Sequence, residues 1–219
     1  MIKLEHTSVM NFENALRGMR NPMNSWDKSD SVFAPALCIG PNDLSLAQRL
    51  VVAGSDDRKF LRQIFVSVDV TAPLYWWKEY DTYKVGTVAN STSTMHKIHS
   101  KTIEMSDFSV DDFVIYNDSK VEMTMCAAMS GVVAMCESFR AEYVKTKDQK
   151  YWRALIQMLP ESYNQMRTCT LNYENLLNIY FARRHHKLDE WHTYCDWIEG
   201  LPYFREICIE GKQNDKRTD

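Results

Sequence analysis

The segment Ile64–Val70 and the proline that follows it constrain the fold more than any other feature of this sequence. From Val66 onward apolar and polar residues alternate and β-branched side chains are frequent, which predicts a β-strand with one buried face. Pro73 suits the first turn of a helix, and the aromatic run Leu74–Tyr80 that it opens indicates a short helix. The chain therefore mixes strand and helix within a few residues.

Helices account for most of the rest. Apolar residues recur at helical spacing in most other segments. A short strand is expected at Ile2–Val9, and Tyr83–Ala89 also has a strand-like composition. We therefore predict an α+β fold in which helices pack around a small, mainly antiparallel sheet. The expected helices are residues 11–19, 41–54, 121–145, 149–158, 172–184, 188–200 and 202–209.

Local signals near the N-terminus predict a loop and a helix start. Asn21–Ser31 is rich in turn-forming residues, which is typical of a loop. Pro41-Asn42-Asp43 predicts the start of a helix with an Asx cap, and Gly54 is placed to end that helix.

The length of the chain, 219 residues, is compatible with one hydrophobic core. Only 7 Gly and 6 Pro are present, which argues against a loop-dominated or disordered chain. We expect a single domain over residues 1–210 and a polar, flexible tail over residues 211–219.

Charge and hydropathy exclude several classes of function. The net charge of −3 gives no electrostatic attraction to nucleic acid or to an anionic membrane. No apolar run approaches the roughly 20 residues that span a bilayer. The first residues also lack the apolar stretch of a signal peptide, so a cytoplasmic location is expected.

Metal sites and the common nucleotide motifs are not indicated. The six cysteines form no Cys-x-x-Cys pair and are expected to be free thiols. His185 and His186 are adjacent, so on a helix they diverge by about 100° and cannot readily share an ion. The sequence has no Gly-x-Gly-x-x-Gly and no Walker loop, which excludes Rossmann and P-loop nucleotide sites.

The stretch Asp69–His96 carries more polar residues than a core needs. Its strand and short helix lead into the hydroxyl-rich run Asn90–Thr94. Hydroxyls and backbone N–H groups suit phosphate or nucleotide oxygens, because several can converge without excess positive charge. The alternative is that these Ser and Thr residues only cap turns and edge a sheet.

A second polar pattern lies on the helix predicted over residues 172–184. Spacings of three place Asn172, Asn175 and Asn178 near one helical face. Arg183 follows one to two turns later and could clamp a carboxylate or phosphate with two hydrogen bonds. The alternative is an amphipathic helix with a solvated polar face.

In order and spacing, the two regions resemble the flavin-dependent thymidylate synthases, the ThyX family. Val70-Thr71-Ala72-Pro73-Leu74-Tyr75 matches the family's strand that ends in Ala-Pro before a short aromatic helix. With the helix from Pro41 to Gly54, the resemblance covers most of the chain, although identity is low. The residues that look like the family's Leu-Pro and later Asn, Asn and Arg are Leu159-Pro160, Asn172, Asn178 and Arg183.

The signature of the family, Arg-His-Arg-x-x-Ser-x-Asn-Glu-x-Ser-x-Arg-Tyr, is largely rewritten in this chain. Only Lys84 keeps a positive charge, and only Thr87 and Thr92 keep the hydroxyls. Glu174 stands where the family often has Arg, which reverses the charge. In the ungapped comparison Thr82-Tyr83-Lys84 replaces Arg-His-Arg, Ala89-Asn90 replaces Asn-Glu, and Thr94-Met95 replaces Arg-Tyr.

The resemblance implies a homotetramer that binds FAD and a dUMP-like pyrimidine nucleotide and transfers a one-carbon group from a folate donor. It assigns Arg183 as the main phosphate clamp and leaves the catalytic residues unassigned. Trp76 and Trp77 are candidates for ring stacking, with buried packing of at least one of them as the favoured alternative. The implied cofactor-binding residues are Lys84, Thr87, Asn90, Asn172 and Asn178, and the implied substrate-binding residues are Thr92, Thr94 and Arg183.

Two other functions are compatible with the same sequence. A non-catalytic protein could keep the fold and sequester or sense a nucleotide, because binding needs fewer aligned groups than catalysis. A helical assembly protein could use its aromatic surfaces only to oligomerise.

Overall fold

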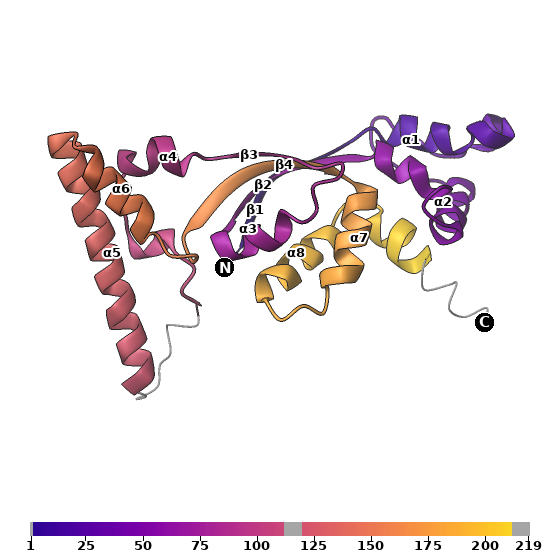
Figure 1. The fold of residues 1–219 in the computed structure, drawn as a ribbon. Coiled ribbons are helices and arrows are strands. Elements are labelled where there is room, and N and C mark those ends of the chain that lie inside the picture. Colours follow the sequence, from indigo (N-terminus) through magenta and orange to yellow (C-terminus); the bar gives the residue numbers. More distant parts are fainter. Residues whose placement is uncertain (1, 112–119, 212–219) are drawn as a thin grey trace. The chain divides into compact units, whose positions relative to one another are not determined.

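A four-stranded sheet in the order β1-β2-β4-β3 organises the chain. A computed structural model describes residues 2–111 and 120–211, so nearly all of the tail predicted to be flexible lies outside the described residues. The α+β fold class is confirmed. The strands are β1 Lys3–Met10, β2 Phe65–Pro73, β3 Val88–Ser91 and β4 Asn164–Asn172 (Figure 1).

The side chains on β2 and β4 show that these two strands run antiparallel. The hydroxyl oxygens of Ser67 and Thr170 lie 2.8 Å apart. Two residues along each strand, the Thr168 hydroxyl donates to an Asp69 carboxylate oxygen at 2.6 Å. Numbering rises along one strand as it falls along the other, as an antiparallel register requires.

Helices and short turns connect the strands. The helix expected to end at Gly54 does end there, and α3 and α6 have the predicted bounds. No helix among the described residues is long and apolar enough to cross a membrane. The helices are α1 Phe12–Met19, α2 Pro41–Ala53, α3 Leu74–Tyr80, α4 Thr94–Lys97, α5 Lys120–Thr146, α6 Gln149–Met158, α7 Tyr173–Arg183 and α8 Asp189–Glu199, with short turns η1 Asn21–Met23, η2 Trp26–Lys28, η3 Arg58–Gln63, η4 Ile98–Ser100, η5 Met105–Asp107 and η7 Arg205–Glu210.

Contacts divide the chain into two compact units, and every strand of the sheet contributes residues to both. The prediction of a single domain over residues 1–210 therefore stays a prediction. Unit 1 comprises Met1–Lys3, Val70–Thr82 and Asn90–Arg167, and unit 2 comprises Leu4–Asp69, Tyr83–Ala89 and Thr168–Asp219.

Unit 1 is built around the pair α5 and α6, which lie side by side (Figure 1). Apolar side chains from this pair pack against the segment after α4, as the helical spacing predicts. The buried cluster that results consists of Ile98, Ile103, Phe108, Met129, Cys136 and Leu155.

Trp76 and Trp77 on α3 also belong to the interior of unit 1. Their exposed fractions are 0% and 1%, and their rings make an edge-to-face contact at 4.9 Å. The Trp77 indole N–H donates to the Gln165 carbonyl at 2.9 Å. The guanidinium of Arg167 covers the Trp77 ring at 4.1 Å. The interpretation of these two residues as stacking surfaces for a ligand ring was therefore wrong, because both rings are buried and in contact with other side chains.

Unit 2 packs α1, α2, α7 and α8 with η3 and η7. Tyr173, at the first position of α7, occupies its centre. Its ring makes edge contacts with Phe12 at 5.5 Å and Phe204 at 5.3 Å. Its hydroxyl donates to the Pro202 carbonyl at 2.6 Å, and burial raises the pKa of this phenol.

Asp43 anchors the predicted loop Asn21–Ser31 to α2. Its fully buried carboxylate accepts hydrogen bonds from Arg20 Nε at 2.6 Å, Ser29 Oγ at 2.7 Å and Ser31 Oγ at 2.6 Å. The Asx cap predicted within Pro41-Asn42-Asp43 was therefore wrong, because the N-cap residue of α2 is Gly40, which makes no side-chain cap. The capping acceptor is Asp30, whose carboxylate accepts from the backbone N–H groups at residues 42 and 43 at 2.9 and 3.0 Å.

Two strands differ from the sequence prediction. β4 was missed, because its buried positions Gln165, Cys169 and Leu171 include few strongly apolar residues. The strand expected over Tyr83–Ala89 begins only at Val88 and continues to Ser91. Residues 83–87 instead form a loop with a left-handed turn at Gly86.

Candidate functional site

The segment Tyr83–Ala89, a loop over residues 83–87 followed by the start of β3, lies against the N-terminal half of α7, within unit 2. Asn175 Nδ2 donates to the carbonyl oxygen of Val85 at 2.7 Å, which holds the loop to the helix. Gly86 has φ of +75°, a conformation that other residues adopt at a cost. A Cβ at this position would lie 3.1 Å from Asn175 Oδ1, so the close approach requires glycine.

Asn172 and Asn175 form a capping box at the start of α7. The Asn172 side chain accepts from the Asn175 backbone N–H at 3.0 Å, and the Asn175 side chain accepts from the Asn172 backbone N–H at 3.2 Å. Asn172 is buried and precedes the first helical residue. Of the three asparagines spaced by three, Asn178 is the exposed one. The spacing thus serves the fold at its first two positions.

Arg183 lies at the last turn of α7, where aromatic rings hold its guanidinium. Its Nε donates to the Tyr83 hydroxyl at 2.8 Å. The guanidinium carbon lies 4.9 Å from the centre of the Trp191 ring and 5.5 Å from that of Tyr83. Cation–π contact of this kind fixes the orientation of an arginine guanidinium. The half-buried side chain therefore carries a positive charge in a defined position.

The two other candidate residues of this loop differ in their availability. Lys84 is exposed at the surface. Thr87 is half-buried and its hydroxyl donates to the Tyr83 carbonyl, so it stabilises the loop itself. Lys84, Thr87, Asn172, Asn178 and Arg183 all belong to unit 2.

Glu174, which stands where the family often has Arg, forms ion pairs with two arginines of η3. The Glu174 carboxylate pairs with Arg58 Nε at 3.1 Å and also with Arg62. Burial raises the pKa of Glu174, but hydrogen bonds from Arg62 and Arg58 outweigh burial and hold it below the usual value. One carboxylate thus pairs with two guanidinium groups, and Asp56 also attracts Arg62, so the cluster carries no net charge.

Asn90, Thr92 and Thr94 belong to unit 1. Asn90 is exposed on β3. The Thr92 hydroxyl donates to the Met166 carbonyl at 3.2 Å, and Gln165 Nε2 donates to the Thr92 carbonyl at 2.9 Å. The strand β3 is thereby tied to β4 just before Thr94 opens α4.

A polar pocket of about 330 Å³ lies in unit 1 beside this strand end. Thr92 and Thr94 both line it, together with Asn164 and two lysines. The ammonium of Lys101 is paired with Asp107, and this hydrogen bond raises the pKa of Lys101. Among the described residues, Lys97 has no hydrogen bond or ion pair through its ammonium. Hydroxyls and one available cation make this pocket suitable for an oxyanion.

Sequence reasoning missed Tyr83, Gly86 and Trp191 as parts of the site. Gly86 was the detectable one, since an isolated glycine in a polar loop signals a positive φ. Tyr83 lies 100 residues before Arg183, and Trp191 contacts the Arg183 guanidinium through the face of its ring. No local sequence pattern predicts contacts of these two kinds. Among residues 2–111 and 120–211, no group of three or more His, Cys, Asp or Glu side chains could hold a metal ion.

The structure is similar to solved flavin-dependent thymidylate synthases. No protein-family model matches the sequence, and no curated protein matches it. ThyX from Helicobacter pylori, crystallised with FAD and dUMP, superposes with a TM-score of 0.64 at 16% identity, over 96% of this chain and 97% of that chain. A second structure of the H. pylori enzyme with the same ligands gives 0.65 at 16% identity, over 95% and 98%.

A third similar structure comes from another enzyme. The UMP/dUMP methylase PolB from Streptomyces cacaoi, bound with 5-Br UMP, has a TM-score of 0.62 at 10% identity, over 91% of this chain and 88% of that chain. The resemblance expected from the order of the two polar regions is therefore confirmed at the level of the fold.

Proposed function

We propose that this protein binds a flavin and a pyrimidine nucleotide and transfers a one-carbon group to a dUMP-like substrate from a folate donor. The observation that carries the proposal is the fixed, charged guanidinium of Arg183, held by Tyr83 and Trp191 beside the loop that Asn175 supports. The similar H. pylori structures contain FAD and dUMP, which supports the choice of ligands.

The residues of the Tyr83–Ala89 loop and α7 fit the phosphates of FAD. Arg183 and Lys84 supply positive charge, and the exposed Asn178 amide can donate hydrogen bonds. At the left-handed turn of Gly86, an added Cβ would lie within 3.1–3.4 Å of the Asn172 and Asn175 side-chain amides, so a larger residue there would crowd both asparagines. Thr87 and Asn172 would support this arrangement through their internal hydrogen bonds.

The substrate phosphate has a suitable pocket in unit 1. Thr92 and Thr94 line the pocket. The positive charge of Lys101 is paired with Asp107, so Lys97 provides the positive charge for the phosphate. A phosphomonoester there would receive one charge-assisted hydrogen bond and several from hydroxyls. The resemblance assigns Arg183 to the substrate phosphate, whereas we propose here that Arg183 in unit 2 holds a phosphate of FAD.

The chemistry assigned to the protein is positioning and electrostatics. A bound reduced flavin would supply the hydride. Arg183, Lys84 and Lys97 would hold anionic ligands, and the capping box of α7 would keep the loop in register. We also propose a homotetramer, as the resemblance implies, and a cytoplasmic location, as expected from the sequence.

A second function is favoured by the loss of charge from the signature. Each charge-assisted hydrogen bond contributes roughly 1.5–3 kcal/mol, and Thr82 and Thr94 stand where the family has arginine. A protein with fewer such groups can bind a nucleotide without aligning it for reaction. We therefore propose non-catalytic nucleotide sensing or sequestration as the alternative.

Calorimetric titration of the full chain with FAD and with dUMP tests the proposal. Arg183→Ala should weaken ligand binding by roughly tenfold or more, and folding should be retained. Arg184→Ala is the matched control, because Arg184 stacks on Phe181 at 5.0 Å and lines a different part of the surface. Absence of binding by the wild type, or equal affinity of Arg183→Ala, would overturn the proposal. Turnover of dUMP with FAD and a folate donor separates the enzyme from the sensor.

A further inference from the structure

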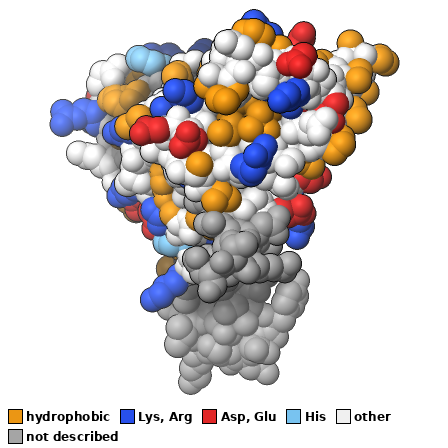
Figure 2. Space-filling view, turned by 90° about the vertical axis from the view of Figure 1, so that its right-hand side faces the viewer, with side chains coloured by type: hydrophobic (Ala, Val, Ile, Leu, Met, Phe, Trp, Pro, Cys, Tyr) orange, Lys and Arg blue, Asp and Glu red, His pale blue; other side chains and the backbone are white. Residues whose placement is uncertain are grey.

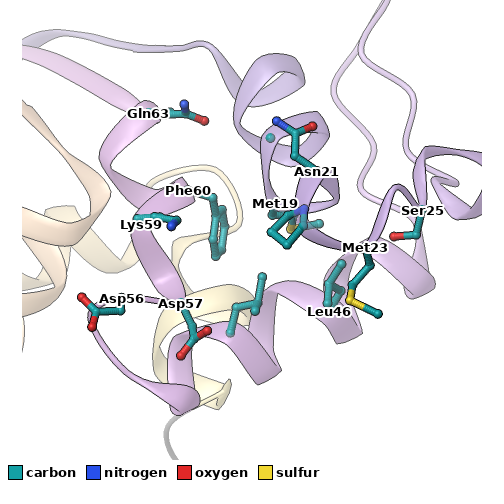
Figure 3. A pocket seen from close by; sticks show the side chains of 13 residues that line it. Met19, Asn21, Met23, Ser25, Leu46, Asp56, Asp57, Lys59, Phe60 and Gln63 are labelled. Carbon is teal, nitrogen blue, oxygen red and sulfur yellow. The ribbon is translucent and has the colours of Figure 1, made fainter.

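Two pockets of the protein differ in the ligand groups that they can select. A pocket of about 830 Å³ in unit 2 lies between the end of α1, the turn η1, α2 and the turn η3 (Figure 3). Apolar side chains and charges of both signs line it together, and Figure 2 shows the same mixture on the surface on the side of α1 and α2. This mixture favours no single class of ligand. The pocket of about 330 Å³ in unit 1 is lined mainly by hydroxyl, amide and ammonium groups instead.

Asn164, the first residue of β4, lines the unit 1 pocket, and the proposed function gives it no role. The Thr92 N–H donates to the Met166 carbonyl at 2.9 Å, which places the chain just before α4 beside the start of β4. Asn164 and Thr94 therefore line the pocket from two adjoining segments of unit 1.

The side-chain amide of Asn164 is oriented by Ser109. The Ser109 hydroxyl donates to Asn164 Oδ1 at 2.8 Å. Ser109 is itself fixed, because its N–H donates to the Ser162 carbonyl at 2.8 Å. Among the residues that the structure describes, none accepts a hydrogen bond from Asn164 Nδ2. Since Ser109 occupies the amide oxygen, Asn164 offers hydrogen-bond donors to a ligand in the pocket.

The phenol of Tyr163 lines the same pocket and is a further donor. Burial and the Asp107 carboxylate raise the pKa of this phenol, against a smaller opposing effect of Lys101. An unperturbed tyrosine titrates near about 10, so the Tyr163 hydroxyl keeps its proton at neutral pH.

Hydrogen-bond donors, rather than net charge, distinguish this pocket. The Asp107 carboxylate accepts from the Lys101 ammonium and from the Glu104 N–H, the latter at 3.0 Å. Glu104 also lies in the field of Lys101, so Asp107 and Glu104 balance the charges of Lys97 and Lys101. A ligand group rich in acceptor oxygens suits such a site, because each donor then finds an acceptor.

We propose that Asn164 is a further phosphate-binding residue, whose amide, oriented by Ser109, donates to the terminal phosphate of a nucleoside monophosphate. The inference rests on the proposed function and deepens it, since an amide donor beside Thr94 takes over part of what the family's Arg supplies. Ser109 is a positioning residue, because it holds the amide oxygen and leaves the N–H groups for the ligand. A terminal phosphate has one more free oxygen than each phosphate of FAD, and therefore accepts from more donors at once.

Binding of inorganic phosphate to the full chain, followed by ³¹P NMR without flavin, tests the role of Asn164. Asn164→Asp keeps the shape of the side chain and its acceptor for Ser109, but it places a carboxylate against the phosphate. We expect roughly tenfold weaker binding of inorganic phosphate, and of dUMP in calorimetry, with deoxyuridine affinity unchanged. Gln157→Glu is the control, because it makes the same change from amide to carboxylate at an exposed position of α6.

Ser109→Ala tests the positioning role. Releasing the amide should weaken phosphate binding roughly two- to tenfold, the value of one neutral hydrogen bond. In the Asn164→Ala background the same substitution should have no further effect, because the oriented donor is already absent. A merely structural role of Ser109 would give the same loss of phosphate affinity in both backgrounds and would overturn the assignment.

Three further results would overturn the inference. They are no binding of inorganic phosphate by the wild type, equal phosphate affinity in Asn164→Asp and Gln157→Glu, and an equal loss of dUMP and deoxyuridine affinity in Asn164→Asp. Failure of the proposed enzyme is distinguishable from these results. A protein that takes up no FAD and turns over no dUMP, yet shows the predicted differences in phosphate affinity, would retain Asn164 as a phosphate-binding residue.

Discussion

Arg183 Nε lies 2.8 Å from the hydroxyl oxygen of Tyr83, a residue 100 positions earlier in the chain. The bond joins the end of α7 to the start of the loop that precedes β3. Because the Trp191 ring also lies over the same guanidinium at 4.9 Å, the Arg183 guanidinium has a fixed position and orientation. A rigid cation beside a loop that contacts α7 is the feature from which the proposed nucleotide site is built.

Tyr83→Phe should test how much of this geometry the hydroxyl supplies. The variant removes one hydrogen bond to a charged group but keeps the ring contacts of Arg183 and Trp191. We expect a loss of roughly 1.5–3 kcal/mol at most in the free energy of unfolding, measured by urea denaturation. FAD affinity should fall less than in Arg183→Ala, since the charge remains. An equal fall in both variants would show that the hydroxyl, not the guanidinium, contacts the ligand.

Gly86→Ala should destabilise the loop. The residue has φ of +75°, and the added Cβ would lie 3.1 Å from Asn175 Oδ1. A left-handed conformation costs a non-glycine residue roughly 1–2 kcal/mol, so thermal unfolding should move to lower temperature.

Gly131→Ala is the control for Gly86→Ala, because we expect it to raise the free energy of unfolding instead of lowering it. Gly131 is exposed within α5, and a Cβ there would have nothing within 4 Å. Replacement by alanine within a helix stabilises it by about 1 kcal/mol. If Gly86→Ala were neutral or stabilising, the loop would not need its left-handed turn.

Asp43→Asn should strongly destabilise unit 2. The change leaves Arg20, of which 4% is exposed, without its buried counter-charge. Removing one partner of a buried pair costs roughly 3–5 kcal/mol, which urea denaturation at neutral pH would measure. Asp27→Asn, at an exposed position, should change stability by less than about 0.5 kcal/mol.

The same carboxylate predicts a loss of stability in acid. Burial raises the pKa of Asp43, but hydrogen bonds from Ser31, Ser29 and Arg20 outweigh burial and hold it below its ordinary value. An unfolded Asp titrates near about 3.9. The stabilisation by Asp43 is therefore complete above that pH and is lost as pH falls through the lower folded-state pKa. Denaturation curves from pH 6 to pH 3 should show the gap between wild type and Asp43→Asn narrowing. A constant gap would contradict this role.

Lys97→Ala should weaken the binding of a nucleotide monophosphate more than that of its nucleoside. The ammonium lines the unit 1 pocket, where the other lysine is paired with Asp107. Loss of one charge-assisted hydrogen bond predicts roughly tenfold weaker dUMP binding in calorimetry. Lys145→Ala, with 77% of the lysine side chain exposed on α5, is the control. Equal dUMP affinity in the two variants would remove Lys97 from the site.

Much of the fold follows from local sequence pattern. The helices α3 and α6 have the predicted bounds because a proline begins one and stops the other near Pro160, while apolar spacing fills each interior. The strand β4 was not predicted because Gln165 occupies a buried position, where an alternating strand pattern requires an apolar residue. Its burial is compensated by the hydrogen bond from Gln165 to the Thr92 carbonyl, which no single-sequence pattern reveals.

The candidate site was predictable only in part. Arg183 and Asn172 stand out by spacing and by resemblance, but the use of Asn172 as a helix cap depends on where α7 begins. The ion pairs of Glu174 with Arg58 and Arg62 join residues more than 100 positions apart. Contacts at this separation follow from the packing of η3 on α7, which the sequence does not encode locally.

The most direct test of flavin binding is the visible absorbance of the freshly purified protein, followed by titration with FAD. We predict a flavin band, or saturable uptake of FAD that Arg183→Ala weakens at least tenfold. A colourless protein that takes up no FAD would contradict the flavin assignment and leave the nucleotide-sensing alternative for this fold.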